Sequence, residues 1–142
     1  MTPIHILLVE DNEGDILLTK EALEESKIVN TVSTVRNGKE AIQFVFKQGE
    51  FADRSSPDLI LLDINLPLKS GHEVLKEIKG NSETTHIPII ILTTSSTKKD
   101  ILMSYEHHAN CYVTKPVEVN DFLNAIISIE NFWFSIVQLP KQ

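Results

Sequence analysis

The chain has 142 residues, of which 42% are hydrophobic and 23% are charged, and this is the composition of one ordinary globular domain. Its formal net charge of -7 disfavours nucleic acid and anionic membrane surfaces as partners, because both would repel it. Apolar runs such as 89–92 are too short to cross a bilayer, and residues 1–9 lack the basic start of a signal peptide. The single cysteine, Cys111, cannot form an internal disulfide. We therefore expect a cytoplasmic protein.

Short apolar runs alternate with stretches of helical periodicity from the start of the chain. Residues 4–9 are apolar and rich in β-branched side chains, and they stop abruptly at acidic residues, which predicts a buried parallel strand. The same reasoning predicts a second strand over 31–35, followed by the turn signal Asn37-Gly38. Helical spacing predicts helices over about 15–26 and around 41–46, and a polar loop is expected over 49–57.

The second half of the chain repeats this alternation. Strands are predicted over 59–62, over 89–92 and over 111–113, with helices after Gly71, over about 97–108 and from near Val117 onward. The order is strand then helix, five times over. The sequence therefore predicts an α/β fold with a five-stranded parallel sheet, doubly wound so that helices cover both faces.

Polar side chains follow the ends of four of these predicted strands. In an open parallel sheet, ligands bind outside the carboxyl ends of the strands, so these side chains are expected to share one edge. The set combines three carboxylates, one or two hydroxyl groups and a lysine, and consists of Glu10, Asp11, Asp63, Thr93, Thr94 and Lys115.

This set suits phosphoryl transfer to a carboxylate. Close carboxylates repel one another unless a cation lies among them, and hard oxygen ligands without cysteine or histidine favour Mg²⁺. The lysine supplies a positive charge, and a hydroxyl group beside it can donate a hydrogen bond to a transferred oxygen. Each residue alone would be unremarkable, since acids often cap helices and lysines are mostly solvated surface residues.

The motifs around these positions resemble the receiver domain of two-component response regulators, which has the flavodoxin-like, CheY-like (βα)5 fold. The resemblance covers about residues 4–130 and includes all the strand-end positions in order. Its motifs are L-L-V-E-D-N at 7–12, D-L-I-L-L-D-I-N-L-P at 58–67, S-G at 70–71, I-I-I-L-T-T at 89–94 and Y-V-T-K-P at 112–116.

The resemblance implies a role for each residue of the set. Asp63 would accept a phosphoryl group from a phosphohistidine on a sensor histidine kinase, and Lys115 would pair with that group. Mg²⁺ would be bound by Asp11 and Asp63 directly, by Glu10 through water and by the backbone carbonyl of Asn65. Thr93 would hydrogen-bond the phosphoryl group, and Tyr112 would be the switch aromatic that follows it. The family also implies a cis Lys115-Pro116 bond.

A narrower resemblance links the chain to the stand-alone regulators paired with bacterial and cyanobacterial phytochrome-type kinases. It rests on residues 10–15, 92–95, 110–116 and 128–133. The receiver domain is expected to span residues 1–130, with residues 131–142 as a C-terminal extension and no attached output domain. Because Phe132, Trp133 and Phe134 are concentrated in that extension, we expect it to be an interface, most simply that of a homodimer.

Two other functions fit parts of the pattern. A metal-dependent phosphohydrolase could use Asp63 as its nucleophile, but such enzymes carry an acid two residues later, and Asn65 cannot shuttle a proton. A flavin-binding domain of the same fold class would need a glycine-rich phosphate loop where this chain has Glu10-Asp11. Asp15 and Glu13 are expected to serve the positive end of the first helix rather than the metal.

Overall fold

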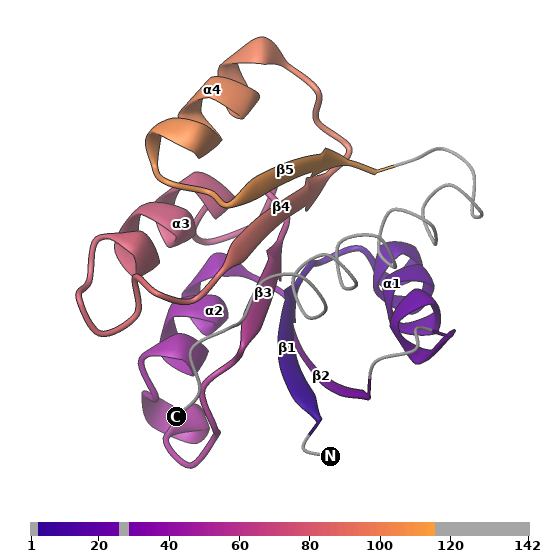
Figure 1. Cartoon of the computed structure of the whole chain (residues 1–142), viewed down its shortest axis with the longest axis vertical. Helices are drawn as coiled ribbons and strands as arrows, with labels where there is room; N and C mark the ends of the chain where they lie inside the picture. Colours follow the sequence, from indigo (N-terminus) through magenta and orange to yellow (C-terminus); the bar gives the residue numbers. More distant parts are fainter. Residues whose placement is uncertain (1–2, 26–28, 116–142) are drawn as a thin grey trace.

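The computed structural model of the protein describes residues 3–25 and 29–115, and in that part the chain forms one parallel sheet with helices on both faces (Figure 1). The strand order is β2-β1-β3-β4-β5, so the chain runs outward from β1 in one direction and then in the other. The strands are β1 (Ile4–Val9), β2 (Asn30–Val35), β3 (Leu59–Leu62), β4 (Ile89–Thr93) and β5 (Cys111–Thr114). All four strand pairs are parallel, as the sequence predicts.

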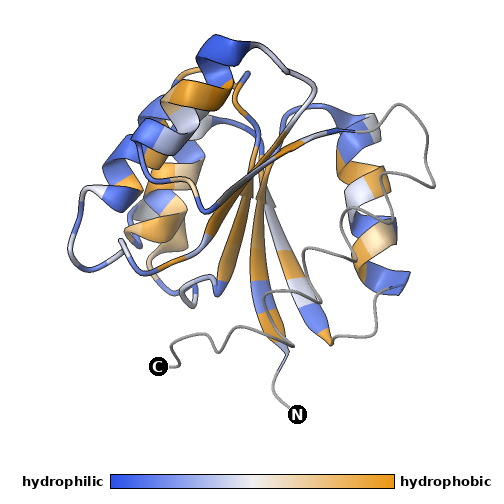
Figure 2. Cartoon of the chain, turned by 45° about the horizontal axis from the view of Figure 1, so that its top comes forward, coloured by the Kyte–Doolittle hydropathy of each residue, from blue (hydrophilic) through white to orange (hydrophobic). Residues whose placement is uncertain are grey.

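Alternate residues of the central strands enter two separate apolar cores. Ile6 and Leu8 of β1 face the first core, together with residues of helix α1 (Glu13–Glu25). Leu7 and Val9 face the second core, together with residues of α2 (Gly38–Val45) and α3 (Gly71–Lys79). Figure 2 shows the result, with apolar strands between helices whose outer sides are hydrophilic. Burial on both faces explains why these strands are continuously apolar instead of alternating.

Polar caps fix where the helices on the second face begin. The Asn37 side chain accepts the Glu40 backbone N–H at 2.8 Å at the start of α2. Ser70 has the same role for α3, and Thr97 has it for helix α4 (Lys98–Glu106). Each cap satisfies a backbone donor that would otherwise lack an intrahelical partner. The caps therefore set the ends of the loops that carry polar residues at the edge of the sheet.

The boundaries differ from expectation in a few places. Helix α1 begins at Glu13 rather than near residue 15, because the Asn12 side chain accepts the Asp15 N–H at 2.9 Å and caps the helix earlier. The expected loop over 49–57 contains a short 3₁₀ helix, η1 (Gly49–Phe51), because Phe51 buries its ring against Phe44 with centroids 5.3 Å apart. The helix expected from near residue 117 lies outside the described residues.

Gly38 is the position in α2 where a side chain has no room. A Cβ atom there would lie 1.9 Å from the Lys69 carbonyl oxygen, which belongs to the backbone and cannot swing away. We expect Gly38→Ala to lower the free energy of unfolding by about 2–3 kcal/mol in urea denaturation, as overpacking does elsewhere. Gly14→Ala is the matched control, since its nearest atom is the Asn12 side-chain Oδ1 at 3.3 Å, which has to give by only a few tenths of an ångström. Equal unfolding midpoints for the two variants would contradict this close approach.

Candidate functional site

The strand register brings the carboxyl ends of β1, β3, β4 and β5 to one edge of the sheet. Val9 pairs with Leu62 and Leu62 with Ile91, so Glu10 and Asp63 follow neighbouring strands at the same level. The Asp63 N–H donates to the Val9 carbonyl at 3.1 Å, so the start of the loop between β3 and α3 is held against β1. Thr93 ends β4 and pairs with residue 114 of β5, one residue before Lys115.

Three carboxylates gather at this edge. Glu10, Asp11 and Asp63 each have an oxygen atom that lies within 4.8 Å of the others. Glu10 is 2% exposed and Asp63 7% exposed, whereas Asp11 is open to solvent. A set of hard oxygen donors, two buried and one solvated, fits Mg²⁺, which binds few carboxylates and keeps several waters. The residues present therefore suit the cation that the sequence predicts.

Lys115 opposes this negative charge from the end of β5. Its ammonium group is buried and donates to Glu10, to Asp63 Oδ2 at 3.2 Å and to Asp15 Oδ2 at 2.8 Å. Burial alone would lower the pKa of Lys115, but hydrogen bonds to Asp15 and Glu10 and the charges of Asp63 and Glu10 outweigh it and raise that pKa. Lys115 is therefore a fixed positive charge at neutral pH.

Burial has the opposite consequence for Glu10. It raises the pKa of Glu10 from 4.5 to about 7, a shift that the Lys115 hydrogen bond opposes and the Asp63 charge reinforces. Near neutral pH Glu10 is therefore partly protonated, and the acidic cluster can lose a proton when it binds a cation. A metal that binds these carboxylates favours the deprotonated form, so metal binding and proton release are linked.

This linkage predicts a pH-dependent affinity for Mg²⁺. With the pKa of Glu10 at about 7, the carboxylate is largely protonated below that value and charged above it. We expect the affinity to rise about three- to tenfold between about pH 6 and about pH 8, with protons released on binding. Calorimetry in two buffers of different ionisation enthalpy measures both the affinity for Mg²⁺ and the number of protons released. Glu10→Gln should flatten the profile, and a flat profile in the original chain would contradict the linkage.

Thr93 and Tyr112, the expected switch residues, meet at Ser95. Thr93 is fully buried, and its Oγ1 accepts the Ser95 N–H at 3.3 Å. The Tyr112 hydroxyl donates to the Ser95 carbonyl at 2.7 Å from the neighbouring strand β5. The two side chains are thus linked through one residue of the β4-α4 loop.

Two residues near Asp63 shape its surroundings. The Asn65 N–H donates to Asp63 Oδ1 at 3.3 Å, so this loop folds back over the carboxylate, while the metal-binding role of the Asn65 carbonyl stays a prediction. Gly71 packs so closely that a Cβ atom there would lie 2.2 Å from the Asp63 carbonyl oxygen. The glycine of the S-G motif is therefore required by the approach of α3 to the site.

The contact between Asp15 and Lys115 is one that the sequence does not predict. Asp15 does lie in the first turn of α1, as expected, but its carboxylate also accepts a hydrogen bond from the ammonium group. The spacing of Asp11 and Asp15 gives no signal for it, because α1 begins at Glu13 and the four-residue periodicity of a helix does not extend to Asp11. Glu13 points elsewhere and pairs with Arg36.

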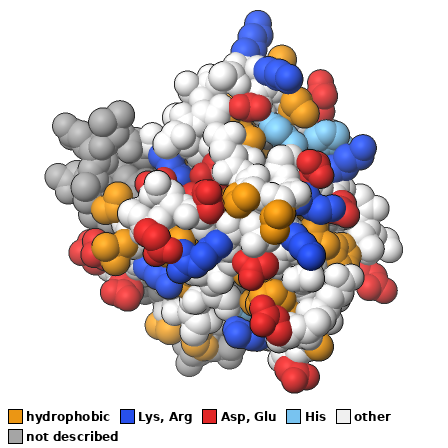
Figure 3. All heavy atoms as spheres, turned by 180° about the vertical axis from the view of Figure 1, so that it is seen from behind, with side chains coloured by type: hydrophobic (Ala, Val, Ile, Leu, Met, Phe, Trp, Pro, Cys, Tyr) orange, Lys and Arg blue, Asp and Glu red, His pale blue; other side chains and the backbone are white. Residues whose placement is uncertain are grey.

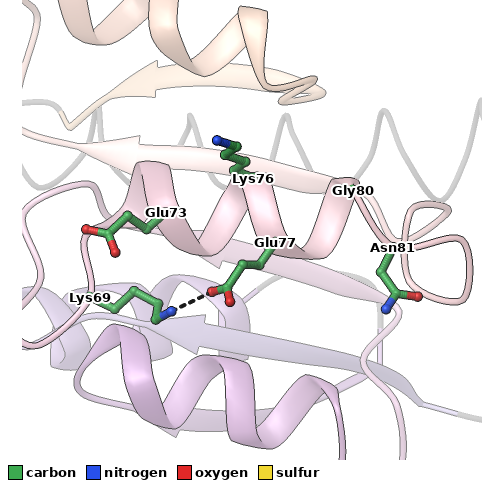
Figure 4. A pocket seen from close by; sticks show the side chains of 6 residues that line it. All are labelled: Lys69, Glu73, Lys76, Glu77, Gly80 and Asn81. Carbon is green, nitrogen blue, oxygen red and sulfur yellow. Dashed lines mark hydrogen bonds and ion pairs between the residues drawn. The ribbon is translucent and has the colours of Figure 1, made fainter.

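The rest of the described surface offers no comparable arrangement. A depression of about 490 Å³ along α3 is lined by charged residues of both signs, and Lys69 pairs there with Glu77 at 2.8 Å (Figure 4). On the face shown in Figure 3, acidic and basic side chains are interspersed. Within the described residues, no helix is both long and apolar enough to span a membrane.

A doubly wound parallel sheet with paired acids, a hydroxyl group and a lysine at its carboxyl edge defines a phosphoacceptor receiver domain. The sequence matches the response regulator receiver domain over residues 6–127, so the chain belongs to that family. Response regulator Rcp1 of Synechocystis sp. is 45% identical over 138 residues, covering 97% of this chain and 94% of Rcp1.

Solved structures agree with this assignment. The phosphorylated cyanobacterial phytochrome response regulator RcpA is 46% identical, with a TM-score of 0.94 over 99% of this chain and 100% of RcpA. The Mn²⁺-bound form of Rcp1 is 45% identical, with a TM-score of 0.92 over 98% of this chain and 100% of that one. The receiver fold and the family resemblance predicted from the sequence are confirmed.

Some predictions fall on residues outside the described part of the chain. These are the cis Lys115-Pro116 bond, the boundary at residue 130 and the interface of Phe132, Trp133 and Phe134. The side chain of Cys111 is likewise not described.

Proposed function

We propose that Asp63 is the phosphoacceptor of this response regulator and that it works with Mg²⁺, Lys115 and Thr93. The observation that carries the proposal is the buried ammonium group of Lys115, which donates to both Glu10 and Asp63 beside the solvated Asp11. Asp11 and Asp63 would bind the cation directly, with Glu10 acting through water and Asn65 through its backbone carbonyl. Bound there, Mg²⁺ would neutralise charge on the phosphoryl oxygens.

The transfer step exchanges one bond for another. A carboxylate oxygen of Asp63 attacks the phosphorus of a phosphohistidine on the sensor histidine kinase. The new P–O bond forms as the P–N bond breaks, and the imidazole leaves with the bonding electron pair. Lys115 stabilises the charge on the transferred group, because its ammonium already lies 3.2 Å from Asp63 Oδ2. Any self-dephosphorylation would be the attack of water on the same phosphorus.

Signalling would follow from rearrangement around the phosphoryl group. The phosphoryl group carries about -1.5 to -2 charges and replaces the single charge of the carboxylate, so the modification adds about one negative charge beside Thr93, whose hydroxyl would turn and donate to it. Tyr112 would follow, since both side chains are held by Ser95 in the present arrangement. This mechanism makes Thr93 and Tyr112 the switch residues that alter the surface of α4 and β5.

We further propose that the protein is cytoplasmic. Its partner would be a phytochrome-type histidine kinase, on the basis of the similarity to Rcp1 and RcpA. The test is transfer of labelled phosphoryl group from such a kinase to this chain, with Mg²⁺ and with a chelator. We expect label to leave the kinase and appear on the chain only with the metal. Sustained phosphate release from a phosphomonoester would instead favour the phosphohydrolase.

We propose that residues 1–130 form the receiver domain and that residues 131–142 form a homodimer interface. Phe132, Trp133 and Phe134 would supply its apolar centre, where aromatic residues contribute most. We expect Trp133→Ala to shift the molar mass measured by light scattering from dimer to monomer, with and without beryllofluoride as probe. A monomeric original chain in both conditions would contradict the interface.

A further inference from the structure

Asp100 joins the switch region to α3 through its two carboxylate oxygens. Ser95 Oγ donates to Asp100 Oδ2 at 2.5 Å, and His72 Nε2 lies 3.0 Å from Asp100 Oδ1. Asp100 stands in the first turn of α4, Ser95 in the β4-α4 loop and His72 in the first turn of α3, and these two helices lie side by side (Figure 1). One carboxylate therefore connects three segments near the phosphoacceptor.

The position of Asp100 is set by its helix. Its N–H donates to Thr97 Oγ1 at 3.2 Å, and its carbonyl accepts the Ser104 hydroxyl at 2.8 Å. The hydrogen bonds of Ser95 and His72 hold the pKa of Asp100 below its usual value, so the carboxylate is charged at neutral pH. A charged acceptor held by a capped helix is a firm anchor, because charge-assisted hydrogen bonds are the stronger kind.

The histidine side of this connection leads back to the phosphoacceptor. His72 is largely buried, and its Nδ1 has no hydrogen-bond partner among the described residues, so Asp100 is the polar contact of this ring there. Because the carboxylate accepts, the Nε2 atom carries the proton. The preceding residue, Gly71, packs against the Asp63 carbonyl. Asp100 thus fixes the β4-α4 loop relative to the segment that flanks Asp63.

Ser95 is the residue through which this anchor reaches the switch. Its N–H, its carbonyl and its hydroxyl group contact Thr93, Tyr112 and Asp100, respectively. Movement of Thr93 toward a phosphoryl group changes at least one of these contacts. The Asp100 hydrogen bond is coupled to that movement because it holds the same residue.

We propose that Asp100 is a positioning residue that holds Ser95, and through it Thr93 and Tyr112, in the arrangement that the structure shows. This proposal rests on the proposed function, in which Thr93 and Tyr112 are the switch residues. Asp100 contacts neither the acidic cluster nor Lys115 in the described residues; its effect is on the equilibrium between the two arrangements. Loss of the anchor therefore shifts that equilibrium, and with it the affinity for a phosphoryl group.

The experiment measures binding of beryllofluoride, used as a phosphoryl mimic, in the presence of Mg²⁺. We expect Asp100→Asn and Ser95→Ala each to change it roughly fivefold in the same direction, with no further change in the double variant, as for two residues sharing one coupling. Ser95→Ala keeps the negative charge, so equal effects separate the hydrogen bond from simple electrostatics. Affinity for Mg²⁺ alone should stay unchanged.

Asp58→Asn is the matched control, because it also neutralises an aspartate that accepts a hydrogen bond, from the His5 N–H at 2.9 Å at the opposite end of the sheet. It should bind beryllofluoride as the original chain does. A second readout is the set of amide chemical shifts of Thr93 and Tyr112 without beryllofluoride, which both test variants should move and the control should not.

Several results would overturn the positioning role. These are unchanged beryllofluoride binding in both test variants, a change in Asp100→Asn without a change in the same direction in Ser95→Ala, or unchanged amide shifts at Thr93 and Tyr112. Failure of the proposed function looks different, since the original chain would then bind no beryllofluoride at Asp63. In that event the amide shifts still decide whether Asp100 positions the two side chains.

Discussion

Asp63→Asn should abolish phosphorylation of the chain by a phosphorylated kinase or by acetyl phosphate. The amide keeps the shape of the side chain but removes the nucleophilic carboxylate and one of the three negative charges of the acidic cluster. We expect incorporation to fall by at least about a thousandfold, to the level of background labelling, as when an essential nucleophile is removed. Measurement of acid-labile phosphate per chain over time gives the rate.

The same change should disturb the fold little. Asp63 is buried and accepts hydrogen bonds from Lys115 on Oδ2 and from Asn65 on Oδ1; the single amide oxygen of Asn can keep one of these, so at most one hydrogen bond is lost. Asp58→Asn again supplies the control, since it removes an equal charge away from this edge and should be phosphorylated at the original rate. Labelling of Asp63→Asn at a rate close to that of the original chain would show that another residue is the acceptor.

Lys115→Met should have the second-largest effect, and it should act on two properties in opposite directions. Removal of the ammonium group takes away the stabilisation of the transferred phosphoryl group, so phosphorylation should slow by about a hundredfold or more. The carboxylates of Glu10 and Asp63 lose their shared donor but become free for a metal. We therefore expect Mg²⁺ to bind this variant more tightly than the original chain.

The stability of Lys115→Met should depend on the metal. Without Mg²⁺, the buried carboxylates that have lost the Lys115 ammonium group should lower the free energy of unfolding by about 3 kcal/mol. Mg²⁺ at a hundred times its dissociation constant should raise it again by about 2.7 kcal/mol. Urea denaturation with and without Mg²⁺ measures both. Lys69→Met, which breaks the exposed pair with Glu77, should unfold almost as the original chain does. A Lys115→Met variant that binds Mg²⁺ more weakly would contradict the competition between lysine and metal.

The sequence was sufficient to predict the fold because hydrophobic burial dominates it. Strand β3 is apolar at every position and buried on both faces, so its bounds match those expected from composition alone. Glu10, Asp63 and Lys115 were predicted to meet because the carboxyl ends of parallel strands share one edge. The order of the strands and the polar residue after each one are enough to place these side chains together.

Contacts made by helix and loop residues could not be predicted in this way. The Asp15 contact depends on where Asn12 caps α1, and a shift of one residue turns a helical side chain by about 100°. The Ser95, Asp100 and His72 contacts depend on how closely α3 and α4 approach each other, which is a product of tertiary packing. Hydrophobic periodicity identifies the apolar face of each helix but leaves its polar neighbours undetermined.

Chemical trapping of the phosphorylated chain tests the central claim most directly. Borohydride reduces an acyl phosphate to an alcohol, so it marks the aspartate that carried the phosphoryl group, and peptide mass spectrometry then locates the mark. With Mg²⁺ and a phosphorylated kinase, we predict that the mark lies at Asp63 and is absent when the metal is chelated. A mark at Asp11 or Asp15, or an unmarked chain that carries its label on a histidine, would contradict the assignment of Asp63 as the phosphoacceptor.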